Sequence, residues 1–85
     1  MNEGKYINFQ WVKRNPKTDV YEVYTKKEHD YLGQVKWYFP WRQYSFFPGT
    51  YLVFEKTCLR DIANFLEKLM MERNEKMILE GLRKK

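Results

Sequence analysis

The sequence predicts an α+β protein in which an antiparallel sheet of four to five strands carries one long C-terminal helix packed on one face. Two patterns lead to this fold. Over residues 5–54, short runs of alternating apolar and polar residues are separated by turn residues, which is typical of half-buried strands. From Thr57 onward the apolar residues recur at spacings of three and four, which indicates an amphipathic helix. A chain of 85 residues has the length of one domain. We therefore expect a single domain over 1–85, with the sheet at about 5–54 and the helix at about 58–75 or longer.

The first strand is expected at residues 5–14, where Ile7 and Phe9 alternate with polar neighbours. Pro16 then favours a turn, and the short link to the next run predicts an antiparallel hairpin. Similar runs rich in β-branched and aromatic residues predict further strands. These lie at 19–25, 32–39 and 42–47, with a short fifth strand at 51–54 after the turn signal Pro48-Gly49.

The helix is expected to begin with Thr57 as its N-cap, and Asp61 is expected in the first turn, where the helix dipole favours a negative charge. It should reach at least Asn74, while Gly81 and the basic end suggest fraying. Its apolar stripe should cover one sheet face and comprises Leu59, Ile62, Ala63, Leu66, Leu69 and Met70. No second helix is predicted, so the other sheet face should be open to solvent or to a partner.

The charge balance is basic, with a net charge of +5 and a pI of about 9.4. Such a balance favours nucleic acid, anionic membranes or acidic proteins as partners, although here the positive charge is spread over both halves of the chain. No apolar run approaches the roughly 18 residues of a membrane helix, and residues 1–5 lack a signal-peptide pattern. A single cysteine allows no internal disulfide. We expect a cytoplasmic protein without a membrane partner.

No arrangement of residues points to catalysis. His29 is the only histidine and lies in a charged loop, and Cys58 is the only cysteine, so the common zinc patterns are absent. Cys58 at a helix start could act as a nucleophile, but such a residue is more often a small buried hydrophobe. The four glycines form no phosphate-binding loop. We expect no enzymatic activity, no cofactor and no metal.

An aromatic run is the most informative feature, because seven of the eleven residues at 37–47 are aromatic. Strand alternation assigns Trp37 and Phe39 to the core with Val35, and Lys36 and Tyr38 to the other face. A hairpin closing at Phe39-Pro40 is expected to set the next strand beside this second group. The resulting platform of two phenols and two cations comprises Lys36, Tyr38, Arg42 and Tyr44.

Bases stack on such rings and cations contact phosphates, so this platform predicts a small nucleic-acid-binding module. Two alternatives stay open. The rings of the run, Trp41 included, could be core and scaffold only. The open face, together with methionines near the helix end such as Met77, could instead bind protein, because Tyr, Trp and Arg are also enriched at protein hot spots. That protein would be a second copy in a homodimer or homo-oligomer, or a host factor.

Two blocks of the sequence carry a resemblance. They read Leu-Gly-x-Val-Lys-Trp-Tyr-x-Pro-Trp-Arg-Gln-Tyr-x-Phe at 32–46 and Cys-Leu-x-Asp-Ile-x-x-Phe at 58–65. This pattern resembles a group of short uncharacterised proteins encoded in phage, prophage and bacterial genomes, over roughly residues 17–72. The resemblance implies an intracellular, phage-related protein, and it brings no catalytic residues and no substrate. It favours nucleic-acid binding or phage-type inhibition of a host or defence protein.

Overall fold

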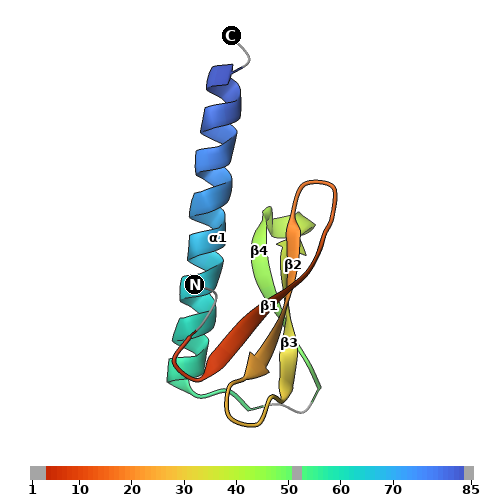
Figure 1. The fold of residues 1–85 in the computed structure, drawn as a ribbon, viewed down its shortest axis with the longest axis vertical. Helices are drawn as coiled ribbons and strands as arrows, with labels where there is room; N and C mark the ends of the chain where they lie inside the picture. Colours follow the sequence, from red (N-terminus) through yellow and green to blue (C-terminus); the bar gives the residue numbers. More distant parts are fainter. Residues whose placement is uncertain (1–3, 51–52, 84–85) are drawn as a thin grey trace.

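One antiparallel sheet and one long helix make up the computed structural model, which describes residues 4–50 and 53–83 (Figure 1). The elements in chain order are β1 (Ile7–Arg14), β2 (Asp19–Thr25), β3 (Tyr31–Tyr38), the 3-10 turn η1 (Phe39–Trp41), β4 (Gln43–Pro48) and α1 (Lys56–Arg83). The helix lies along one side of the sheet and continues past it toward the C-terminus (Figure 1). The predicted α+β arrangement is confirmed.

Each strand of the sheet pairs with the next one along the chain, in the order β1-β2-β3-β4. β2 and β3 are therefore central, and β1 and β4 are the two edges. Of the expected strand at 51–54, residues 51–52 lie outside the described part of the chain, and Val53 and Phe54 form no strand. The described sheet ends at Pro48, and Gly49 then donates its N–H to the Leu32 carbonyl at 2.9 Å.

The pairing of β2 with β3 contains a register shift that depends on a glycine. Val23 pairs with Gly33, but Tyr24 pairs with Tyr31, so Leu32 is an additional residue on β3. Gly33 has a φ of +151°, which L side chains rarely adopt, and a Cβ at this position would collide with the Phe47 carbonyl oxygen. The shift allows Leu32 to join the buried core, where strict alternation would have turned it away.

The core lies between α1 and the covered sheet face, and Phe65 is at its centre. The Phe65 ring stacks on Phe9 with centroids 4.0 Å apart and meets the Tyr21 ring edge-on at 4.9 Å. The buried residues of this cluster are Ile7, Phe9, Tyr21, Val23, Leu32, Val35, Tyr44, Ile62, Phe65 and Leu69. The expected helical stripe was therefore partly wrong, because Leu59 is 49% exposed and Ala63 is also exposed.

The start of α1 differs from the expected one. The carboxylate of Glu55 accepts the Cys58 N–H at 2.6 Å, and its carbonyl accepts the Leu59 N–H at 3.1 Å, so Glu55 is the N-cap in place of Thr57. Hydrogen bonds from Thr57 and Cys58 N–H groups hold the pKa of the Glu55 carboxyl below its ordinary value. Asp61 lies in the second turn, where it accepts the Lys5 N–H at 2.7 Å and fixes the segment before β1 to the helix.

The helix is longer than its expected core segment. It contains 28 residues and passes through Gly81 to Arg83, so the suggested fraying does not interrupt it within the described residues. Its C-terminal part extends beyond the end of the sheet (Figure 1). Among the described residues, no helix is both long enough and apolar enough to cross a membrane.

Candidate binding surface on the open sheet face

The register of β3 with β4 determines which side chains share a sheet face. Trp37 pairs with Tyr44, and Lys36 pairs with Ser45. The loop 39–42 between the strands contains four residues, an even number, so each even-numbered residue of β3 faces an odd-numbered residue of β4. Directly opposed residues lie on the same face. Tyr44 therefore shares the face of Trp37, and the expected grouping of Tyr44 with Lys36 and Tyr38 is wrong.

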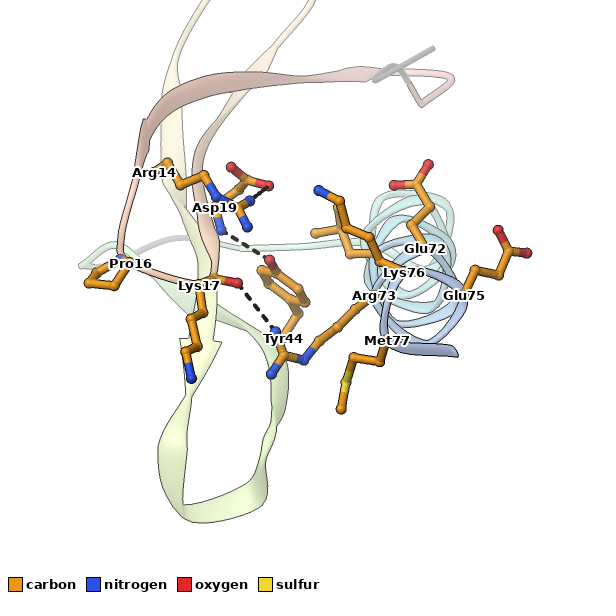
Figure 2. A pocket seen from close by; sticks show the side chains of 11 residues that line it. Arg14, Pro16, Lys17, Asp19, Tyr44, Glu72, Arg73, Glu75, Lys76 and Met77 are labelled. Carbon is orange, nitrogen blue, oxygen red and sulfur yellow. Dashed lines mark hydrogen bonds and ion pairs between the residues drawn. The ribbon is translucent and has the colours of Figure 1, made fainter. Parts of the chain in front are cut away.

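Tyr44 lies on the face that α1 covers and is only 6% exposed (Figure 2). Its ring meets the ring of Trp37 edge-on at 5.5 Å. Its backbone N–H donates to the Met70 sulfur at 3.4 Å, and its hydroxyl accepts the Asp19 N–H at 3.0 Å. Tyr44 thus connects β4 to α1 and to the start of β2, and it does not face solvent on a platform.

Arg42 lies in the turn at the end of the sheet and belongs to neither face. It has a left-handed conformation with a φ of 51°, and its N–H donates to the Phe39 carbonyl at 3.1 Å to close η1. Its side chain is exposed. Phe39 in the same turn is 76% exposed, so its expected place in the core is wrong, whereas Trp37 does pack against the core.

The face that α1 does not cover, hereafter the open face, carries a different group of rings. The Tyr38 ring meets the rings of Trp41 and Phe47 edge-on, at 5.0 Å and 5.8 Å. The ammonium group of Lys36 lies 4.6 Å from the centroid of the Phe47 ring. Trp41 itself is 67% exposed at the turn. We call these four residues, Lys36, Tyr38, Trp41 and Phe47, the ring cluster.

Of the four residues expected from the sequence, the structure brings Lys36 and Tyr38 together in this cluster. Arg42 lies close by in sequence at the adjoining turn, and Tyr44 is on the opposite face. Sequence reasoning missed Phe47 as a member. The signal was available, because any even loop length gives Phe47 the same face as Lys36.

A hollow on the other side of the molecule lies between α1 and the β1–β2 turn (Figure 2). It has a volume of about 700 Å³ and contains charged groups of both signs. Arg14 and Asp19 form an ion pair at 3.0 Å. Arg73 donates to the Lys17 carbonyl at 3.2 Å, and its guanidinium lies 4.4 Å from the Trp37 ring centroid. The bond from Arg73 holds the β1–β2 turn against α1, and the Arg14–Asp19 pair links β1 to β2, so these groups have a structural role.

His29 and Cys58, the two residues considered for catalysis, both make contacts that stabilise the fold. The ring of His29 stacks on Tyr24 with centroids 4.5 Å apart in the β2–β3 turn. Cys58 packs against the core, and burial, followed by the hydrogen bond with Glu55, raises the pKa of its thiol. A raised pKa favours the unreactive thiol form. In the part of the chain that the structure describes, no group of three or more His, Cys, Asp or Glu side chains could hold a metal ion.

The fold and this surface define a class of small α+β protein in which a four-stranded antiparallel sheet has a helix on one face and rings on the other. The chain is 35% identical over 72 residues to the "Uncharacterized 9.3 kDa protein" of Acholeplasma phage L2, over 84% of this chain and 92% of that protein. The chain therefore belongs to the same family as this phage protein, in agreement with the expected phage resemblance. No family model matches it, and no solved structure matches it.

Proposed function

We propose that this protein binds single-stranded nucleic acid on the open face of its sheet. One observation carries the proposal: Lys36 lies over Phe47 beside the rings of Tyr38 and Trp41, on the face without a helix. Bases stack on exposed rings with about 1–3 kcal/mol per base, and a cation beside the rings can contact the phosphate between two stacked bases. Open antiparallel sheets with such rings are a common platform for single strands.

Charge and polarity around the ring cluster support the same function. Arg42 is exposed at the adjoining turn, and the whole chain has a net charge of +5. Gln34 and Gln43 lie on the same face as Lys36 and Tyr38, and their amides can donate to and accept from base edges. One acidic residue on the same face, Glu22 on the neighbouring strand, opposes this positive charge, and its carboxylate accepts the Tyr24 hydroxyl at 2.9 Å.

In this proposal, the sequence block at 32–46 that carries the phage resemblance is the binding element, because it contains three of the four residues of the ring cluster. Binding needs no catalysis, cofactor or metal, and we propose that the protein has none. A nucleic-acid-binding phage protein acts where phage nucleic acid is copied and read, so we propose a cytoplasmic location.

The test is binding of fluorescein-labelled single-stranded DNA and RNA oligonucleotides by fluorescence anisotropy, at about 25 mM and about 200 mM salt. Trp41→Ala and Phe47→Ala should each weaken binding about 5- to 150-fold, the equivalent of one lost stacking contact. The matched control is Trp11→Ala, because Trp11 is also exposed, at 57%, but lies on β1. Absence of binding to every oligonucleotide at low salt, or equal loss in Trp11→Ala, would reject the proposal.

A second candidate function is inhibition of a host or defence protein. It is favoured by three large apolar side chains that α1 exposes toward its C-terminal part, Met71, Met77 and Ile78. Flexible methionines adapt to a protein partner. This function predicts capture of one host protein that persists after nuclease treatment and is lost in Met77→Asp, whereas the nucleic-acid function predicts that nuclease removes everything captured.

A further inference from the structure

The two edges of the sheet differ in the features that protect an edge strand. β1 carries Lys13 and Arg14, and its register with β2 shifts between Trp11 and Lys13. Charges and bulges of this kind prevent unintended strand pairing. β4 has the sequence Gln-Tyr-Ser-Phe-Phe-Pro, contains no charged residue, and pairs with β3 in one unbroken register. Only β4 therefore presents a regular, uncharged edge within the described sheet.

The outward backbone groups of β4 can be identified from one hydrogen bond. The Tyr44 N–H donates to the Met70 sulfur, so it points away from β3. Alternate residues of a strand point their N–H and C=O groups to the same side, so those of Phe46 also point outward. Pro48 follows on this outer row and has no N–H to offer. A thioether sulfur is a weak acceptor, and a carbonyl oxygen would replace it readily.

The β4 edge borders a groove, and α1 forms the other side of that groove. The groove has a volume of about 690 Å³. Its apolar part comprises Trp41, Phe46, Leu66, Met70 and Met71. Methionine side chains have three rotatable bonds and a soft sulfur, so Met70 and Met71 can move aside without leaving a polar group unpaired.

We propose that a second copy of this chain occupies the β4 edge, with the two β4 strands antiparallel about a two-fold axis at Ser45. In this register the outward N–H and C=O groups of Tyr44 pair with those of Phe46 of the partner subunit, and the reverse pair forms by symmetry. All the outward groups of the two residues are then paired. If the two-fold axis lay at Phe46 instead, the Tyr44 carbonyl would face Pro48 of the partner subunit. Proline has no N–H, so this carbonyl would stay unpaired.

The charges of β4 and its flanks suit a second copy. Ser45 faces Ser45 of the partner subunit at the axis, so no charged residue of the strand meets its own copy there. The two Arg42 side chains lie at opposite ends of the paired strands, because the strands are antiparallel. The axis is perpendicular to the sheet, so both α1 helices lie on one side and the exposed Met71 becomes part of the contact. The dimer is argued without the proposed nucleic-acid binding, although Trp41 belongs both to the groove and to the ring cluster.

The first test is the sedimentation velocity of the full chain without nucleic acid over a range of concentrations. The wild type should form dimers. Ser45→Glu should shift the equilibrium toward monomer by about fivefold, because like charges then face each other across the axis. Within one subunit the new carboxylate faces Lys36, which favours folding. The matched control Gln10→Lys adds a charge opposite Glu22 on the β1 edge and should leave the dimer unchanged. A wild type that stays monomeric, or a Ser45→Glu protein that dimerises normally, would overturn the proposal.

The second test reads the register directly by disulfide formation in a Cys58→Ser background, with oxidised glutathione as the electron acceptor. Residues 45 of the two strands form a non-hydrogen-bonded pair with Cα atoms about 4.5 Å apart, within the range of a disulfide. Ser45→Cys should therefore give a covalent dimer. Gln43→Cys should not, because its two copies lie about 13 Å apart in this register. Crosslinking of Gln43→Cys in preference to Ser45→Cys would show a different pairing and reject the proposed one.

Discussion

The hydroxyl of Tyr44 on β4 accepts the backbone N–H of Asp19 on β2 at 3.0 Å, although β3 lies between these two strands in the sheet. The bond passes beneath the sheet on the α1 side, where Figure 2 shows the ring between Asp19 and Arg73. The hydrogen bond of Tyr44 thus connects the β3–β4 hairpin to the β1–β2 hairpin. Its loss should affect stability, and nucleic-acid binding only to the extent that folding is lost.

We expect Tyr44→Phe to lower the free energy of unfolding by about 1 kcal/mol, because the Asp19 N–H loses its acceptor. Tyr44→Ala should cost about 3–5 kcal/mol, since the ring is also lost from the core. Urea denaturation monitored by tryptophan fluorescence measures both. Ser45→Ala, on the neighbouring residue, is the control and should change little. Loss of nucleic-acid binding by fully folded Tyr44→Phe would contradict this assignment.

The Lys36 ammonium should contribute one phosphate contact. In Lys36→Ala, the slope of log binding constant against log salt concentration should therefore fall by about one, with weaker binding to every sequence. A salt titration of oligonucleotide anisotropy measures this slope. Lys27→Ala, in the exposed β2–β3 turn, provides the comparison and should keep the wild-type slope. An unchanged slope in Lys36→Ala would mean that Lys36 makes no phosphate contact.

Gly33→Ala should destabilise the fold strongly. The φ of +151° is strained for alanine, by about 1–3 kcal/mol, and its Cβ would collide with the carbonyl of Phe47 on the adjacent strand. Thermal unfolding monitored by circular dichroism should show a marked fall in Tm. Gln34→Ala changes the next residue without either problem and is the reference. A wild-type Tm for Gly33→Ala would show that β3 and β4 can separate here at no cost.

The N-cap at Glu55 should make stability depend on pH at the acidic end. Its pKa is lowered in the folded protein by hydrogen bonds from Thr57 and Cys58. A lowered folded pKa means that its stabilisation is present above the unfolded pKa and is lost as the pH falls through the folded pKa. Glu55→Gln should therefore be less stable than wild type at neutral pH, and the difference should vanish in acid. Urea denaturation at several pH values tests this, with Glu67→Gln as the control.

The strand pattern could be predicted well, because each strand has its own alternation of apolar and polar residues. β2, for example, begins and ends at the residues the sequence indicated. Which side chains share the open face could not be settled by alternation within single strands. That relation depends on the loop length between strands, and the even loop at 39–42 places Tyr44 with Trp37. The ring cluster was accordingly predicted only in part.

The helix start illustrates a second limit. The sequence indicates Thr57 as the cap, because a hydroxyl is a preferred N-cap group and a glutamate is not. The structure selects Glu55 because its side chain reaches the Cys58 N–H, a choice that depends on how the chain leaves the sheet. Along α1 it is Phe65, and not Ala63, that faces the sheet.

The meander order of the strands has a consequence for the speed of folding. Every strand pairs with its sequence neighbour, and turns of only a few residues join them, so the sheet can form from local contacts at low entropic cost. The contact between Phe9 and Phe65, by contrast, must close most of the chain into a loop. We expect the hairpins to form first and α1 to dock last. A substitution such as Phe65→Leu should then raise the unfolding rate much more than it lowers the folding rate in stopped-flow measurements.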